Sequence, residues 1–324
     1  MGEGLKQYLR HPSAAVTRVR IQQLRRADRR EHYDDRTFLE KLYAIKFGKK
    51  PNLENPETFS EKLQWLKLYD RRPEYTRMVD KYEAKGYAAE RIGEEYIIPT
   101  LGVWDHFDEI PFDELPDRFV LKCTHDSGGL RICRDKATFD FDEARERLEH
   151  CLGRSYFRNN REWPYKNVNP RILAEQYMED SDGKGELTDY KLHFFGGECR
   201  AVLVAQNRFG KGGLYKDFYT PEWGHMDFTR GDGPNAPSRV PRPEQLDDMI
   251  RLGKKLAGDY PFIRTDFYVI NGDIYFGEMT FFPGSGTLRF HPDRWDRVFG
   301  EWIQLPEKRT EKSGAEAPEG TGKG

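Results

Sequence analysis

The feature that most constrains the fold of this chain is a pair of hairpin patterns in its second half. Each consists of two runs rich in β-branched and aromatic residues around a turn pair, Gly196-Gly197 in one case and Asn271-Gly272 in the other. Such pairs between apolar runs are typical of tight β-turns. The predicted strands are Tyr190–Phe195 with Arg200–Gln206, and Arg264–Ile270 with Ile274–Phe282. We therefore expect antiparallel sheet in this half of the chain.

The first third has a different pattern. From Asp35 to about Arg91 the apolar residues recur with the 3.6-residue period of helices. Thr58 and Glu61 have the spacing of a helix capping box. Further along the chain we expect shorter strands at 119–123, 130–133 and 171–178, and helices at 139–152 and 243–257. The predicted class is α+β, with antiparallel sheets behind a helical N-terminal region.

Composition excludes several classes of protein. The 324 residues include 21 Phe, 17 Tyr and 6 Trp, enough for a sizeable core in one large or two ordinary domains. Lys plus Arg (53) nearly balance Asp plus Glu (55), so nothing in the overall charge indicates nucleic acid as a partner. The longest apolar run, 201–205, is far shorter than the roughly 18 residues of a membrane helix. The four cysteines form no CxxC pair, and we expect free thiols in a cytoplasmic protein.

The two ends of the chain differ from the rest. Residues 1–30 carry eight Lys or Arg against two acids, and a helix is expected from Ala14 to Arg30 with Val16, Val19 and Leu24 on one face. This helix would either be solvated or make a weak contact with an acidic membrane surface or a partner, placing the protein at the cytoplasmic face of a membrane. The polar segment 306–324 is predicted to be a disordered tail.

The strongest local pattern is the last hairpin, where Asp266 and Glu278 lie on adjacent strands. Two carboxylates on one face of a hairpin can bind Mg²⁺, which prefers oxygen ligands. A two-residue turn would place the two acids on opposite faces, whereas a three-residue loop, Ile270–Gly272, would place them on the same face. Metal binding is therefore predicted to require the three-residue loop. The alternative is a pair of solvent-facing acids.

Two further patterns indicate an anion site. Lys122 stands in an apolar strand before the loop Asp126-Ser127-Gly128-Gly129, and must either reach solvent or point at an anionic group. The loop joins two strands and so differs from a P-loop, but its amides could still close over phosphates. Asp189 and Lys191 open a later strand, close after the segment Glu175–Met178. The small residues of Pro283-Gly284-Ser285-Gly286 could also let backbone amides approach an anion.

In this order the motifs resemble the ATP-grasp enzymes, and within them the TupA-like group linked to teichuronopeptide and capsular polysaccharide synthesis. The resemblance covers about residues 55–303. It is carried by five stretches: 58–70, 93–104 with Asp80-Lys81, 119–129, 162–166 and 276–286. It implies the ATP-grasp fold, in which two α+β lobes hold ATP between them. The implied organisation is the segment 1–30, a helical region 31–95, a small lobe 96–178, a large lobe 179–305 and the tail.

The resemblance also implies roles for individual residues. Lys122, Lys191 and Arg264 would act on the phosphates, and Asp126–Gly129 would cover them. Glu175, Gln176, Tyr177 and Met178 would bind adenine, with Asp189 and Lys191 near ribose and phosphate. Asp266 and Glu278 would bind Mg²⁺ together with Thr280, which stands where many ATP-grasp ligases carry Asn. Arg200, Asn207, Arg208, Ser285 and Gly286 are candidates for substrate contacts, as are Trp163, Tyr165 and Lys166.

The implied activity is ATP-dependent carboxylate–amine ligation through an acyl phosphate. The substrates would be a carboxylate, such as a hexuronate of a cell-surface polysaccharide or its precursor, and an amino acid or other amine. One alternative is a phosphotransferase acting on a sugar hydroxyl, with His193 or Asp189 as the base. The other is a nucleotide-binding module without catalysis. His125 and His193 are expected to have structural or substrate-binding roles in the favoured ligase.

Overall fold

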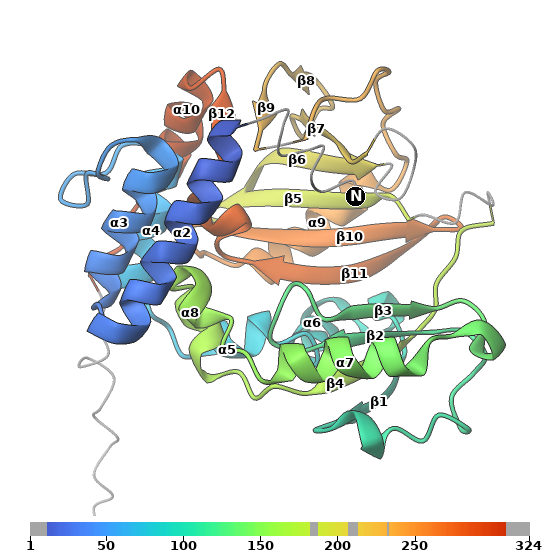
Figure 1. Ribbon diagram of the computed structural model, residues 1–324. Helices are drawn as coiled ribbons and strands as arrows, with labels where there is room; N and C mark the ends of the chain where they lie inside the picture. The colour runs from blue at the N-terminus through green and yellow to red at the C-terminus, as the bar shows by residue number, and fades with distance from the viewer. Residues whose placement is uncertain (1–11, 182–186, 207–212, 232, 309–324) are drawn as a thin grey trace, which may run out of the picture.

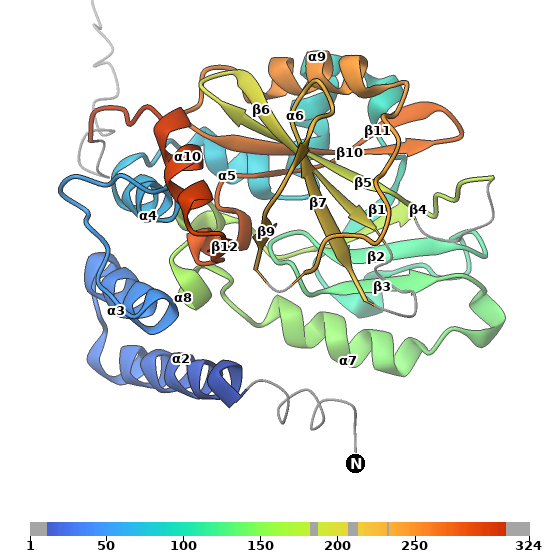
Figure 2. The ribbon, with the colours of Figure 1, turned by 90° about the horizontal axis from the view of Figure 1, so that it is seen from above.

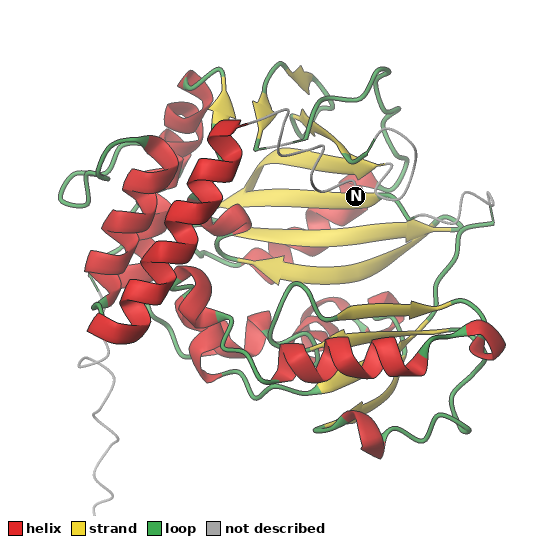
Figure 3. Cartoon of the chain, viewed as in Figure 1, coloured by secondary structure: helices red, strands yellow, loops and turns green. Residues whose placement is uncertain are grey.

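Two antiparallel sheets, one above the other, form the body of the protein (Figure 1). The computed structural model describes residues 12–181, 187–206, 213–231 and 233–308. A four-stranded small sheet has the order β1-β4-β2-β3, and a six-stranded large sheet has the order β11-β10-β5-β6-β7-β8. Helices of the N-terminal region stand beside one end of the large sheet (Figure 3). The predicted α+β class with antiparallel sheets is confirmed.

The small sheet and its helices come from the middle of the chain. Its strands are β1 (Thr100–Trp104), β2 (Phe119–Cys123), β3 (Leu130–Cys133) and β4 (Ile172–Gln176). Helix α7 (Phe141–Leu152) packs on this sheet, and α8 (Phe157–Asn160) and the short η1 (Glu94–Tyr96), η2 (Phe107–Glu109), η3 (Lys136–Thr138) and η4 (Trp163–Asn167) lie in the same part of the chain. One face packs on α7 around Phe119, Leu121 and Leu148. Since side chains alternate along a strand, Val120, Lys122 and Glu175 lie on the other face.

The large sheet contains both predicted hairpins. Its strands are β5 (Asp189–Phe195), β6 (Glu198–Gln206), β7 (Tyr215–Tyr219), β8 (His225–Met226), β10 (Ile263–Ile270) and β11 (Asp273–Thr280). A two-stranded sheet joins β9 (Thr229–Arg230) to β12 (Phe290–His291). Helix α9 (Leu246–Ala257) lies along one face, where Gly253 approaches the side chains of Phe194 and Thr265 (Figure 2). The opposite face looks toward the small sheet and α7.

The helical N-terminal region shares its core with the large sheet. It comprises α3 (Asp35–Phe47), α4 (Phe59–Tyr69), α5 (Glu74–Val79) and α6 (Glu83–Ile92), and α10 (Arg294–Trp302) joins it from the C-terminal side. The predicted capping box of Thr58 and Glu61 is present at the start of α4. Phe59 is fully buried against Phe262, Phe290 and Phe299. This core fixes α4 beside η5 (Pro283–Gly286), which borders the site described below.

Helix α2 (Pro12–Glu31) confirms the expected N-terminal helix. Leu24 is buried beside Phe38 and Leu42, whereas Val16 and Val19 are each about half exposed. Among the described residues, no helix is long and apolar enough to cross a membrane. All four cysteines are free, as expected, and three of them are buried.

A buried ion pair holds α2 to the body of the protein. Asp28 accepts from Arg161 Nη2 at 2.7 Å, and both side chains are less than a tenth exposed. Removing one partner of a buried pair is costly, but Arg161 keeps a second partner, Asp35, at 2.9 Å. We expect Asp28→Ala to destabilise the protein by about 2 kcal/mol in denaturant unfolding. Asp108→Ala, which removes an exposed pair with Arg145, should have a much smaller effect; equal effects would contradict the prediction.

Candidate active site

The predicted functional residues of the large sheet lie in two rows on the face opposite α9. Residues directly opposite each other in an antiparallel pair point to the same face. Lys191 of β5 is opposite Asp266 of β10, which is opposite Glu278 of β11. The second row, one step along the strands, consists of His193, Arg264 and Thr280. The fold therefore gathers these side chains in front of the small sheet.

The hairpin achieves this with a register other than the predicted one. Ile270 pairs with Asp273, so Asn271-Gly272 is a two-residue turn with φ of 53° and 91°, and the predicted three-residue loop is wrong. The register changes after Asp266, where Gly277 is left over as a β-bulge. A Cβ at Gly277 would lie 3.1 Å from the Asp266 carbonyl oxygen. The bulge turns Glu278 onto the face of Asp266, so the two acids share a face despite the tight turn.

Charged side chains of both rows, together with Asp189, form a continuous network. Lys191 Nζ lies 2.5 Å from both Asp189 Oδ2 and Asp266 Oδ2. Arg264 Nη2 donates at 2.7 Å to Asp266 Oδ2 and at 2.7 Å to Glu278 Oε1. Burial alone would lower the pKa of Lys191, but Asp189 and Asp266 raise it above its ordinary value. Lys191 and Arg264 therefore remain cationic beside the acids.

The same network has the oxygen donors that Mg²⁺ prefers. It holds three carboxylates, of Asp189, Asp266 and Glu278, and two cations, Lys191 and Arg264. Because one Arg264 nitrogen contacts both Asp266 and Glu278, small side-chain movements would let one small cation contact both acids. Thr280 Oγ1 is 3.4 Å from Glu278 Oε1 and adds a hydroxyl. In the described part of the chain no three His, Cys, Asp or Glu side chains converge as metal ligands.

On the small sheet, Lys122 points at an anionic group, one of the two outcomes expected. Its Nζ forms an ion pair with Glu175 of the neighbouring strand β4. Glu175 also accepts from Lys85 Nζ of α6 at 2.6 Å. Burial would raise the pKa of Glu175, but Lys122 and Lys85 together lower it to about 2. Glu175 is thus held between two lysines at the edge of the cleft.

The loop Asp126–Gly129 is held by its own first residue. The Asp126 carboxylate accepts from the backbone amides of Gly128 and Gly129 at 3.2 and 2.9 Å. Lys81 Nζ donates to the Asp126 carbonyl, and Ser127 Oγ lies 3.2 Å from the Tyr156 hydroxyl. The loop follows β2, the strand that carries Lys122, and its residues Asp126 and Ser127 line a cavity together with Glu278 of the large sheet.

Two cavities occupy the cleft. The first, of about 170 Å³, lies between the sheets and is lined by Lys122, Glu175, Gln176, Tyr177, Met178 and Asp189, with Ile98, Val120, Leu130, Ile132 and Tyr268 among its other walls. The second, of about 230 Å³, is lined by Lys81, Asp126, Ser127, Arg264, Glu278 and Thr280 and by Glu162, Tyr165 and Ser285, among others. The first cavity is mainly apolar and the second is polar and charged, as a purine followed by phosphates requires.

The η5 turn at the second cavity is fixed from behind. Ser285 has a φ of 57°, and its hydroxyl donates to Glu162 while accepting from Asn160 Nδ2 at 2.8 Å. Its carbonyl accepts from the buried Lys67 Nζ at 2.9 Å. Gly286 packs against Gln64 of α4. The backbone of this turn is therefore rigidly placed at the cavity wall, while the substrate contacts predicted for Ser285 and Gly286 stay predictions.

Other predicted residues are not brought to the site. Arg200 is exposed at the far end of the β5–β6 hairpin, and Asn207 and Arg208 lie outside the described residues. Trp163 is buried in the core, which leaves little of its side chain for the substrate contact predicted for it. Lys166 is exposed, while Tyr165 lines the second cavity. His125 is structural, since its Nε2 contacts the carbonyls of Cys151 and Arg154.

Sequence reasoning gave no role to Lys81, Lys85 or Glu162, although all three are at the site. Lys81 lies in the turn before α6 and Lys85 lies in the first turns of that helix, so helical periodicity alone does not bring the two lysines together. Glu162 contacts Ser285, 123 residues away in the chain, and no local pattern indicates this.

A lysine-bearing sheet with a glycine loop, facing an acid-bearing sheet across a cleft, is the arrangement expected of an ATP-grasp protein. The sequence model of the family described as TupA-like ATPgrasp matches residues 61–304. The chain therefore belongs to the TupA-like ATP-grasp family, and the expected resemblance and fold are confirmed.

Solved structures with some similarity include ligases. D-alanine–D-alanine ligase from Bacillus anthracis complexed with ATP is 16% identical, with a TM-score of 0.37 over 63% of this chain and 54% of that chain. The Helicobacter pylori D-alanine–D-alanine ligase is 15% identical, with a TM-score of 0.41 over 76% and 69%. N5-carboxyaminoimidazole synthetase from Staphylococcus aureus is 11% identical, with a TM-score of 0.39 over 71% of this chain and 53% of that chain. The chain thus spans about half the length of the first and third. No curated protein matches it.

Proposed function

We propose that this protein is an ATP-dependent ligase that joins a carboxylate to an amine. The observation that carries the proposal is the placement of Asp266, Glu278 and Arg264 on one sheet opposite Lys122 and the Asp126–Gly129 loop on the other. A carboxylate is a poor acylating agent because its leaving group would be oxide. Transfer of a phosphoryl group from ATP turns it into an acyl phosphate, which an amine then attacks, releasing phosphate.

Each group of site residues would have its own part in the ligase reaction. The apolar cavity at Gln176–Met178 would hold the purine, and Lys122 and Lys81 would neutralise the phosphates. Asp266, Glu278 and Thr280 would bind Mg²⁺, which supplies charge neutralisation at the transferred phosphoryl group. Arg264 and Lys191 would stabilise the negative charge that spreads over the same group. The loop at Asp126–Gly129 would exclude water and so protect the acyl phosphate from hydrolysis.

For substrates we propose a hexuronate of a cell-surface polysaccharide or its precursor as the carboxylate, and an amino acid or other amine as its partner. Membership of the TupA-like family supports this class of substrates.

Hydroxylamine trapping tests the reaction type. With ATP, Mg²⁺ and glucuronate, we expect hydroxylamine to capture the acyl phosphate as a hydroxamate, with one ADP formed for each hydroxamate. Omitting ATP is the control. ADP formation with a phosphorylated sugar and no hydroxamate would instead establish the phosphotransferase. Nucleotide binding without turnover, over a panel of uronates and amines, would favour the non-catalytic module.

A further inference from the structure

A third cavity lies beyond Arg264 on the same face of the large sheet. Its volume is about 280 Å³, and it shares Arg264, Pro283 and Gly284 with the second cavity. Its floor consists of side chains from three adjacent strands: Lys191 and His193 of β5, Leu203 and Ala205 of β6, and Lys216 and Phe218 of β7. Leu214, Arg230 and Leu288 complete it. We call this cavity the basic pocket.

The charge of the basic pocket has one sign. Lys191, Lys216, Arg230 and Arg264 line it, and none of its described lining residues is acidic. Lys191 and Arg264 are compensated by Asp189, Asp266 and Glu278, whereas Arg230 makes no ion pair within the described residues, although the buried Asp296 acts on its charge from farther away. Arg230 is 5% exposed, its Nη2 donates to the Pro283 carbonyl at 3.0 Å, and its Nε has no partner there. A buried cation with an unused donor can bind an anionic group that enters the pocket.

Arg230 is also held in place as a cation. Its guanidinium lies 5.0 and 5.1 Å from the ring centroids of Phe59 and Phe290. Burial lowers its pKa to about 10, so it remains protonated at neutral pH. The side chain is therefore preorganised rather than free to swing into solvent.

His193 contributes an imidazole ring to the wall of the basic pocket. Its Nδ1 lies 3.0 Å from the Lys191 carbonyl oxygen, which can only accept, so Nδ1 carries the proton. Burial, followed by the charges of Arg264 and Arg230, holds the pKa of His193 well below its ordinary value. The ring is therefore neutral and Nε2 is a bare acceptor. This atom is buried and has no partner among the described residues.

We propose that the basic pocket binds a small carboxylate that also carries an N–H or O–H donor, and that it is the subsite for one of the two substrates of the proposed ligase. The carboxylate would lie against Arg230 and Lys216, and the donor would reach His193 Nε2. Both an amino acid and a uronic acid have this chemistry. The role of the ligand as a ligase substrate rests on the proposed function. Its binding does not, because the charges and the unused polar atoms are features of the pocket itself.

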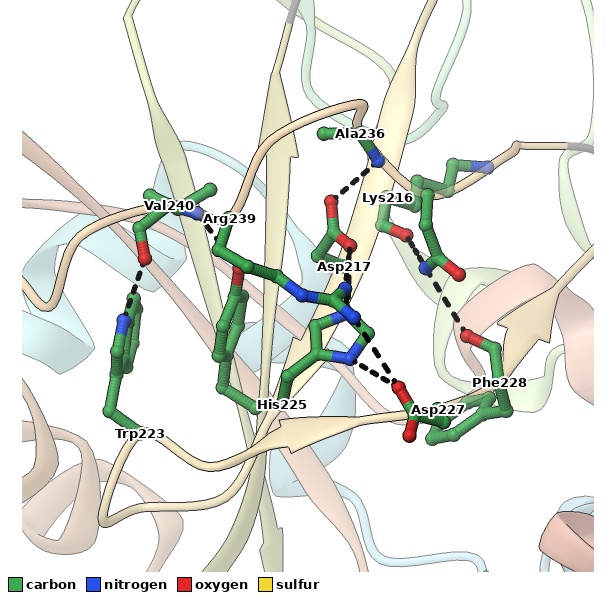
Figure 4. Close-up of polar contacts among 11 residues, drawn as sticks. Lys216, Asp217, Trp223, His225, Asp227, Phe228, Ala236, Arg239 and Val240 are labelled. Atoms are coloured by element: carbon green, nitrogen blue, oxygen red, sulfur yellow. Dashed lines mark hydrogen bonds and ion pairs between the residues drawn. The ribbon is translucent and has the colours of Figure 1, made fainter.

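The back of β7 supports this assignment. Asp217, next to Lys216 in the chain, points to the opposite face, where its Oδ1 contacts His225 Nε2 and its Oδ2 accepts from the Ala236 amide, both at 2.9 Å (Figure 4). Asn235 Nδ2 donates to the carbonyls of Lys216 and Phe228 at 2.9 and 3.3 Å. These contacts fix the backbone at Lys216. They also connect it to Phe228, which directly precedes β9, the strand that carries Arg230.

Binding of D-glucuronate and of L-serine, each measured by calorimetry on the ADP-saturated protein, tests the proposal. D-glucose and ethanolamine, which lack the carboxylate, are the matched probes. We expect one of the two carboxylates to bind and its matched probe to bind at least tenfold more weakly. Glucuronate binding would identify the pocket as the acyl-donor subsite, and serine binding as the amine subsite. Binding of neither carboxylate would overturn the proposal.

Variants locate the binding. Arg230→Met and Lys216→Met should each weaken the carboxylate at least tenfold while leaving ADP affinity within twofold, and Arg200→Met, an exposed arginine on the same sheet, should change neither. Lys216 is only partly buried, so its variant tests the pocket even if Arg230→Met unfolds. Unchanged carboxylate binding in Lys216→Met would overturn the proposal. Failure of the wild type to bind ADP would instead count against the proposed function.

Discussion

Glu278→Gln is expected to lower ADP formation about 1000-fold, which corresponds to about 4 kcal/mol of transition-state stabilisation. Glutamine keeps the shape of the side chain and can still accept the 2.7 Å hydrogen bond from Arg264 Nη2. It removes the negative charge that Mg²⁺ requires. Because Glu278 is 45% exposed, its loss should leave the melting temperature nearly unchanged. A coupled assay for ADP, with thermal unfolding of the same preparation, gives both values.

Asp273→Asn is the matched control for this experiment. Asp273 is an exposed acid of the same strand, next to the Asn271-Gly272 turn and remote from Arg264. The same change of charge there should leave turnover within about twofold, as expected for surface substitutions. Normal activity in Glu278→Gln, or an equal loss in Asp273→Asn, would show that the Asp266–Glu278 pair is not the metal site.

That pair also shows where prediction from sequence ends. The two strands, the Asn-Gly turn and the two acids could all be identified from local pattern. Whether the two acids lie on the same face of the hairpin could not be predicted. One unpaired residue moves every later side chain of its strand to the opposite face of the sheet. Gly277 was the available indication, since glycine within a strand often marks a bulge. Whether a given glycine does so depends on contacts with the partner strand, here the Asp266 carbonyl.

The same limit explains the rest of the site. Strands 119–123 and 130–133 have the predicted bounds, because their apolar alternation is local. The partner of Lys122 is on β4, more than fifty residues along the chain, and Lys85 reaches Glu175 across 90 residues. The basic pocket combines three strands with Arg230 and η5. Contacts of this kind follow from how the elements pack, which periodicity and turn chemistry do not specify.

The Glu175 cluster leads to the second large effect, which is on stability. Glu175→Gln should destabilise the protein by about 3 kcal/mol at neutral pH, because it leaves Lys85 and Lys122 beside each other without the charge that both contact. Glu179→Gln is the matched control, since Glu179 is in the exposed segment after β4 and its pair with Arg118 is solvated. Denaturant unfolding should therefore show a much larger loss of unfolding free energy for Glu175→Gln than for Glu179→Gln.

The stabilisation that Glu175 contributes should depend on pH in a direction set by its lowered pKa. The pKa of Glu175 falls from 4.5 to about 2 on folding, so the ionised side chain stabilises the folded state above about pH 4.5. This contribution is lost as the pH falls from 4.5 through 2, and by linkage it amounts to about 3 kcal/mol. The difference in unfolding free energy between the wild type and Glu175→Gln should therefore be largest near neutrality and shrink across this window. A difference that stays constant down to pH 2 would mean that the lysines do not hold Glu175 ionised, and that Lys122 is positioned in the cleft by something other than this carboxylate.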